Sequence, residues 1–165
     1  MLIGEYDDAE KAFAIDYGSA YYHGFMGEMR LLQDRPDEAA MHFRQAVSLD
    51  REGFQGPRAM AWLASLSGDY KRGLAAAKQI EQASLLDAEV TYHNAHYFCA
   101  NRDLDSCNRL LREAIDQGYF NYPDIKSTPF LDLVRGTPAF EESLELARQK
   151  HEQFKARHSP DRGTN

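Results

Sequence analysis

The sequence predicts an all-α protein, a solenoid of αα-hairpins closed by a helical C-terminal cap. Three observations support this fold class. Segments beginning at Asp34, Gly68 and Arg102 superpose without insertion at a spacing of 34 residues. Within each segment the apolar residues recur with the period of an α-helix. A short polar turn precedes each segment, and a second helical stretch precedes each turn. Two antiparallel helices joined by a short turn form one αα-hairpin.

Composition limits the partners of the protein. The 165 residues are 43% hydrophobic and 27% charged, with a formal net charge of −7, which is typical of one folded domain or of four to five stacked repeats. An acidic chain is a poor ligand for nucleic-acid phosphates, so we expect no nucleic-acid partner. No apolar run approaches the roughly 18 residues of a membrane span, and the N-terminal residues are acidic. These features predict a cytoplasmic protein without a membrane partner.

Residues 1–17 are predicted to form half a repeat. Residues 4–16 carry the second-helix pattern, with Tyr6, Ala9 and Phe13 in the small-then-aromatic places, but no first helix precedes them. The chain is therefore expected to begin inside a solenoid, as a fragment would. A half repeat leaves one apolar flank uncovered, which predicts self-association through this end or fraying of it.

Residues 18–121 are predicted to form three full 34-residue repeats. Their first helices are expected at about 20–33, 54–67 and 88–101, each followed by one of the aligned segments. Small residues recur where the two helices of each hairpin would cross. They are Gly27, Ala61 and Ala95 in the first helices, and Ala39, Gly73 and Cys107 in the second. One turn after the second set come Phe43, Ala77 and Leu111.

The period is lost after Gly118, which is predicted to stop a helix. Residues 122–158 are expected to form the cap. Ser127-Thr128-Pro129 and Thr137-Pro138 each place a hydroxyl before a proline, a helix-start signal. They predict a short turn at 129–135 ended by Gly136, and a helix at 138–157 with Phe140, Leu144, Ala147 and Phe154 on one stripe. Residues 159–165 are predicted to be a disordered tail.

The three units resemble tetratricopeptide repeats, which share the small residues at the helix crossings. The Trp near the start of the first helix and the closing Pro of that family are absent here. Residues 118–157 also resemble the closing segment of the tetratricopeptide regions found in bacterial multidomain regulators and serine/threonine kinases. The resemblance implies a right-handed solenoid whose first helices line a concave groove for a protein or peptide segment. RNA-reading helical repeats of 35 residues fit the spacing and the acidity less well.

Family analogy places the partner-binding residues on the first helices. The expected contacts are Tyr21, Glu28, Arg58, Trp62, Tyr92 and His96, with Trp62 either at the centre of the groove or between repeats. The expected function is a protein–protein interaction scaffold within a larger bacterial regulator. The alternative is the regulatory domain of an enzyme, a kinase or cyclase whose catalytic part lies outside this chain. A small-ligand sensor is a third possibility.

The sequence predicts no catalytic site, no metal site and no disulfide. His93, His96 and Cys99 follow one another at intervals of three residues, which rotates them around the helix and keeps them from converging on one ion. A bridge between Cys99 and Cys107 is disfavoured because Cys107 occupies a small-residue packing place. No phosphate-binding glycine loop or nucleophile motif is present. The sequence therefore predicts no enzyme activity and no cofactor.

Overall fold

The computed structural model describes residues 18–83 and 87–158. Over these residues the chain contains helices, turns and bends but no strand, which confirms the all-α prediction. In chain order the helices are α2 (Ala20–Leu32), α3 (Pro36–Leu49), α4 (Gln55–Ser67), α5 (Tyr70–Ala83), α6 (Ala88–Ala100), α7 (Leu104–Gln117), α8 (Tyr122–Ser127), the 3-10 helix η2 (Pro129–Leu131) and α9 (Pro138–His158). The predicted half repeat at 1–17 and the predicted tail at 159–165 lie outside the described residues.

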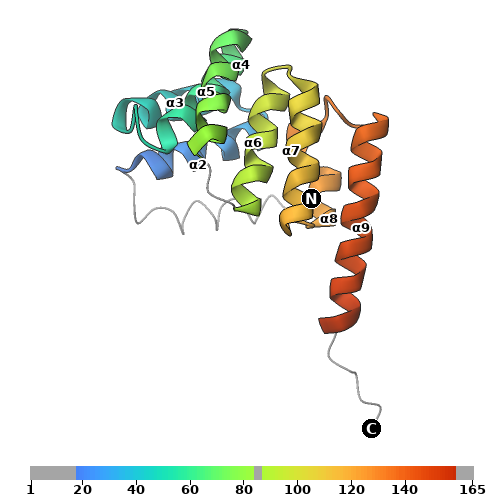
Figure 1. Ribbon diagram of the computed structural model, residues 1–165. Coiled ribbons are helices and arrows are strands. Elements are labelled where there is room, and N and C mark those ends of the chain that lie inside the picture. The colour runs from blue at the N-terminus through green and yellow to red at the C-terminus, as the bar shows by residue number, and fades with distance from the viewer. Residues whose placement is uncertain (1–17, 84–86, 159–165) are drawn as a thin grey trace. The chain divides into compact units, whose positions relative to one another are not determined.

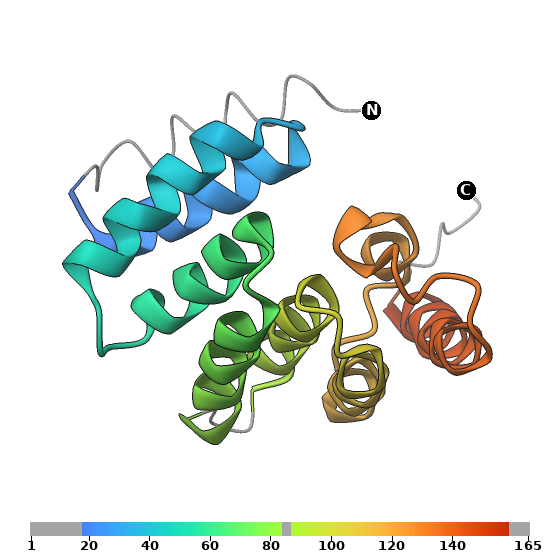
Figure 2. The same ribbon diagram turned by 90° about the horizontal axis from the view of Figure 1, so that it is seen from above.

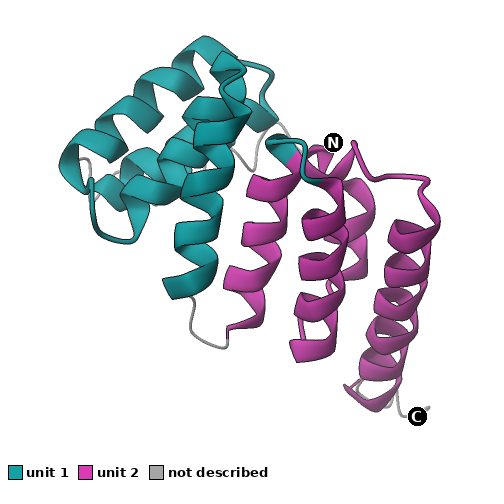
Figure 3. Ribbon diagram, turned by 45° about the horizontal axis from the view of Figure 1, so that its top comes forward, with its two compact units in different colours: residues 1–83, 100–103 teal, residues 84–99, 104–165 magenta. Residues whose placement is uncertain are grey.

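The chain divides into two compact units (Figure 3). Unit 1 comprises residues 1–83 together with 100–103, and unit 2 comprises residues 84–99 together with 104–165. The division does not follow the 34-residue repeat, because the third hairpin contributes its turn to unit 1 and its helices to unit 2.

Unit 1 is built from two helical hairpins. Helix α2 packs against α3 and helix α4 packs against α5, while α3 and α2 both contact α4. The two members of each hairpin lie side by side in Figures 1 and 2. This arrangement of neighbouring pairs is what the repeated pattern predicts.

The 34-residue register is visible in the helix positions. The second helices begin at Pro36, Tyr70 and Leu104, each 34 residues after the one before. All the residues aligned at the predicted crossings are buried, including Ala39 and Cys107, which are fully inaccessible. The repeat therefore reports packing, because the same places meet a neighbouring helix in each copy.

Close backbone approach explains the small residue late in α2. A methyl group on Gly27 would come within 2.3 Å of Cε1 of Phe43, so only glycine lets the Phe43 ring lie against α2. In α5, Gly73 makes a different close contact, with a polar side chain from the turn after α6. A methyl group on Gly73 would meet Oδ1 of Asn101 at 1.8 Å, and Nδ2 of Asn101 donates to the carbonyl of Ala61 at 3.0 Å.

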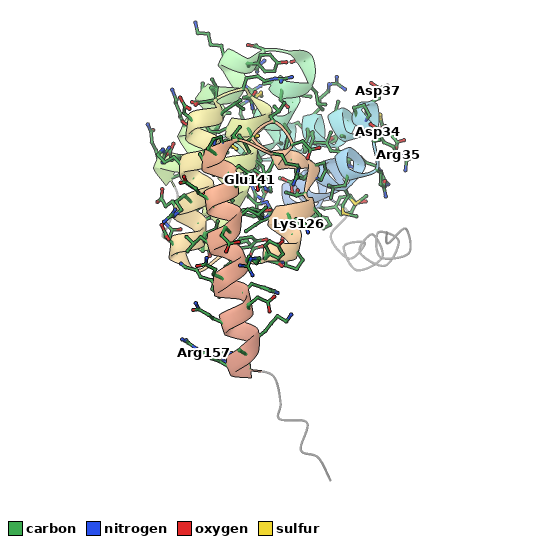
Figure 4. All side chains as sticks on the ribbon, turned by 90° about the vertical axis from the view of Figure 1, so that its right-hand side faces the viewer. Asp34, Arg35, Asp37, Lys126, Glu141 and Arg157 are labelled. Atoms are coloured by element: carbon green, nitrogen blue, oxygen red, sulfur yellow. The ribbon has the colours of Figure 1, made fainter. Side chains whose placement is uncertain are left out.

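Glycines end two of the helices, and an aspartate side chain caps the start of another. Gly68 ends α4 with φ of 76°, a left-handed conformation that favours glycine, and the predicted stop at Gly118 has φ of 120°. The backbone N–H of Gln55 donates to the Asp50 carboxylate at 2.8 Å, which satisfies one of the open donors at the start of α4. At the start of α3, the charged residues Asp34, Arg35 and Asp37 lie on the surface (Figure 4).

Unit 2 contains α6 to α9. Helices α6 and α7 run side by side in Figures 1 and 3, and the Thr91 hydroxyl joins them by donating to Oε1 of Gln117 at 2.8 Å. Helix α9 packs against α7 and α8, and Nζ of Lys150 donates to the carbonyl of Ile115 at 2.9 Å. Thr137 precedes the first residue of α9, and its Oγ1 accepts from the N–H of Phe140 at 3.4 Å, so the predicted start of this helix is confirmed.

Two details of the predicted cap are corrected. Residues 122–127 form helix α8, which the sequence pattern did not indicate, and the expected turn at 129–135 is helical only at 129–131. Phe154 does not belong to the buried stripe with Phe140 and Ala147, because 50% of its surface is exposed. It touches Phe120 and stacks on His158 in the last turns of α9, where Arg157 projects from the helix (Figure 4).

Within the described residues, none of the helices combines the length and the apolar character that crossing a bilayer requires.

Candidate partner-binding surface

The first helices of unit 1, α2 and α4, contact each other. A methyl group on Gly24 would come within 3.1 Å of Oε1 of Gln55, so the end of the Gln55 side chain lies against α2 at this point. One turn further along, Nε1 of Trp62 donates to Oε1 of Glu28 at 2.9 Å. Glu28 and Trp62 are 34 residues apart, so this hydrogen bond joins equivalent places of neighbouring repeats. We call the set Tyr21, Gly24, Glu28, Gln55 and Arg58 the α2/α4 face.

The indole of Trp62 lies in the core of unit 1. Only 4% of its surface is exposed, and its ring stacks on Phe43 with centroids 6.4 Å apart and planes 18° apart. Of the two positions that the sequence left open for Trp62, the centre of a groove and the contact between repeats, this burial supports the second. Its polar edge reaches Glu28 because a buried indole N–H requires an acceptor.

Tyr21, Glu28 and Arg58 are the predicted contact residues on the α2/α4 face, and none of the three is fully buried. Tyr21 exposes 52% of its surface, and Arg58 is half-buried. The guanidinium carbon of Arg58 lies 5.1 Å from the centre of the Phe54 ring, and that ring is itself exposed. Such stacking holds the long Arg58 side chain in place against the Phe54 ring.

The predicted contacts in unit 2 lie inside an aromatic cluster. Tyr92 and His96 expose 1% and 3% of their surfaces, which corrects the expectation that they face a partner. Tyr92 stacks on Tyr119 with centroids 4.1 Å apart, and His96 packs edge-on against Tyr92 at 4.4 Å. Phe130 covers the other side of His96 at 5.3 Å. We call these four rings the Tyr92 cluster.

The Asp124 carboxylate lies near the two phenol groups of the Tyr92 cluster. The Tyr119 hydroxyl donates to Oδ2 of Asp124 at 2.8 Å. Burial raises the pKa of Tyr92 and of Tyr119 above the ordinary tyrosine value, and the nearby Asp124 raises both pKa values further. Both phenols therefore stay protonated at neutral pH, which suits packing and hydrogen bonding rather than proton transfer.

His93, His96 and Cys99 do not form a metal-binding group in the described residues. The rings of His93 and His96 have centroids 5.5 Å apart and meet at 79°, and Nε2 of His93 lies 3.8 Å from the Glu89 carboxylate on the surface. In residues 18–83 and 87–158, no group of three or more histidine, cysteine or acidic side chains is placed to hold an ion. Cys99 and Cys107 are buried free thiols.

Two features were not found by sequence reasoning. His23 and His42 face one another across the α2–α3 hairpin, beside a pocket of about 290 Å³. Phe54 and Pro57 line a second pocket of about 190 Å³ against the end of α5. The predicted hairpin could have indicated the histidine pair, because the turn between α2 and α3 brings the helix turn that holds His23 close to the helix turn that holds His42.

No family model, curated protein or solved structure matches this chain.

Proposed function

We propose that the chain is a protein–protein interaction module that binds a partner segment on the α2/α4 face. The carrying observation is that Tyr21 and Arg58 are accessible on two helices that the Trp62–Glu28 hydrogen bond holds in register. Tyrosine and arginine are the residue types that most often supply binding energy at interfaces. A face whose helices are fixed before binding loses less conformational entropy when a partner docks.

The chemistry of the face selects the partner segment. Arg58 offers a positioned guanidinium, which recognises a carboxylate in a planar, two-point geometry. Glu28 already accepts from the Trp62 indole, which lowers its capacity to attract a basic residue. The proposed ligand is therefore a segment with an acidic side chain or a C-terminal carboxylate beside an apolar residue that packs on Tyr21.

Trp62, Tyr92 and His96 take a different role in this proposal from the one expected. Each packs inside its own unit, and none of the three touches the partner. The tetratricopeptide resemblance supports the interaction role and a right-handed stacking of the hairpins. It also supports placement in a larger bacterial regulator, whose other domains would supply the output.

The test uses peptides selected from a displayed random library against the full chain. Affinities for the selected peptides are then measured by fluorescence anisotropy with Tyr21→Ala and Arg58→Ala. Each substitution is expected to weaken binding about thirtyfold, which corresponds to the ~2 kcal/mol of an interface hot spot. Peptides with the carboxylate converted to an amide should lose a similar factor.

Met41→Ala is the matched control, because Met41 is an exposed, flexible side chain on α3. It should leave peptide affinity unchanged, and circular dichroism should show that all variants remain folded. Selected peptides whose binding survives both Tyr21→Ala and Arg58→Ala would place the interaction elsewhere and refute the proposed face.

A further inference from the structure

His23 on α2 and His42 on α3 point ring nitrogens at each other. Their Nδ1 atoms are 3.1 Å apart, and both rings are half-buried. Tyr22 lies edge-on to both rings, with centroids 5.2 Å from His23 and 6.2 Å from His42. The two histidines come from neighbouring helices of one hairpin, so well-packed backbone elements fix their separation.

The 3.1 Å contact accommodates a single proton between the two Nδ1 atoms, because one must donate and the other must accept. A second proton would set two N–H groups against each other. The ring that accepts in this contact directs an unprotonated Nδ1 at its neighbour, and an unprotonated imidazole nitrogen is the atom that a metal ion binds.

The separation fits a shared metal ion. Histidine nitrogens bind zinc and similar ions at about 2.0–2.1 Å, and two nitrogens 3.1 Å apart then subtend an angle of about 95–102° at the metal. That angle lies between the cis angle of a tetragonal ion and the tetrahedral angle. When the ion binds, the ring that donated from Nδ1 must change tautomer: it releases its Nδ1 proton to water and takes up a proton from water on Nε2, so both neutral imidazoles bind the ion through Nδ1.

The space beside the pair can hold an ion with its remaining ligands. The pocket of about 290 Å³ is lined by both histidines and by Met41, Arg44 and Gln45. Met41 offers a thioether sulfur and Gln45 an amide oxygen, while the exposed Arg44 weakens the attraction for any cation. Water molecules also fit a pocket of this size.

We propose that His23 and His42 form an open binding site for a divalent transition metal ion of the imidazole-preferring class. This site is independent of the proposed partner-binding face. Two imidazole ligands favour Cu²⁺ over Ni²⁺ and Zn²⁺ in the general affinity order, and they disfavour Ca²⁺ and Mg²⁺, which prefer oxygen. The free coordination positions would be taken by water or by a donor from Met41 or Gln45.

The experiment titrates the full chain, without a histidine tag, with Cu²⁺, Ni²⁺, Zn²⁺ and Ca²⁺ by isothermal titration calorimetry. One equivalent of Cu²⁺ is expected to bind, with weaker binding of Ni²⁺ and Zn²⁺ and none of Ca²⁺. His23→Gln and His42→Gln should each weaken Cu²⁺ binding at least tenfold. His151→Gln and His158→Gln, which remove histidines from α9, are the matched controls and should bind as the wild type does.

A second measurement keeps the test valid if a variant unfolds. Addition of Zn²⁺ to the wild-type protein should shift the NMR signals of the His23 and His42 imidazoles before those of the other histidines. Binding that survives His23→Gln and His42→Gln, or a first shift at another histidine, overturns the proposal. So does the lack of saturable Cu²⁺ binding to the folded wild type, in which case the pair is a proton-sharing packing contact.

Discussion

Trp62 shows why a single aromatic residue on an inner helix is hard to assign from its position. The repeat register places it level with Glu28 and His96, where a ring can face either a partner or the next repeat. The structure resolves the choice because Phe43 stacks on the ring and Glu28 accepts its N–H. An aromatic ring with both its face and its polar edge already in contact is a packing residue.

Trp62 therefore should behave as a core residue in solution. Its fluorescence is expected to be blue-shifted and weakly quenched by acrylamide, because the indole is shielded from water. Trp62→Ala should lower the free energy of unfolding by about 3–5 kcal/mol, as for other large core truncations. Urea unfolding measures this, and Tyr21→Ala, which removes an exposed ring, should change stability by no more than about 0.5 kcal/mol. Strong quenching with little loss of stability would contradict the assignment.

Tyr92 predicts how unit 2 responds to alkali. In the unfolded chain a tyrosine ionises near pH 10, while burial and Asp124 raise the pKa of Tyr92 in the folded protein. Above about pH 10 the unfolded state thus binds fewer protons than the folded state. The free energy of unfolding must then fall with rising pH, by at most about 1.4 kcal/mol per pH unit from this group.

Tyr92→Phe removes the ionisable group and should reduce the loss of stability between pH 8 and pH 11. The measurement is urea unfolding at a series of pH values. Tyr70→Phe, which removes an exposed hydroxyl from unit 1, is the control and should follow the wild type. Identical pH profiles for Tyr92→Phe and the wild type would show that the Tyr92 phenol is not protected.

At the scale of the element, the hairpins are determined by where two helices can approach. Phe43 occupies the space that a side chain on Gly27 would need. The residues aligned with this pair, Ala61 and Ala77 in the second repeat and Ala95 and Leu111 in the third, are buried as well. Apolar period and residue size both appear in the sequence, which is why the long helices could be predicted. Helix α8 could not, because six residues are too few to display a 3.6-residue period.

Gly27 and Gly24 form a matched pair for testing the crossing. Alanine favours a helix by about 1 kcal/mol over glycine, so an unobstructed Gly→Ala change in α2 should stabilise. Gly27→Ala should instead destabilise by about 1–3 kcal/mol, because its new methyl group would overlap the Phe43 ring. Gly24→Ala meets only the movable end of Gln55 and should be neutral or stabilising. Thermal unfolding of the two variants decides, and equal effects would refute the crossing.

At the scale of the whole molecule, the sequence predicted the fold class and the helix register, but three of the six residues that it suggested for partner contact are buried. Periodicity reports which helix face is buried, and it cannot tell a residue buried by its own repeat from one buried by a partner. Tyr92 and His96 were expected to contact a partner, and Trp62 was left open between the groove and the contact between repeats, but all three are buried against other residues of the chain itself. The histidine pair needs the hairpin geometry as well as the pattern, because its members are 19 residues apart.

Asn101 carries a consequence for grafting parts of this protein into chimeras. Its side chain donates to Ala61 and occupies the space above Gly73, and residues 100–103 belong to unit 1 although the segments on both sides belong to unit 2. A fusion that ends at Ala83 would omit the amide and leave a gap over Gly73. The shortest contiguous segment that contains all of unit 1 must extend to Asp103. Such a segment includes α6, which belongs to unit 2, but leaves out its neighbour α7. Neither unit can therefore be transplanted by itself as an uninterrupted piece of gene.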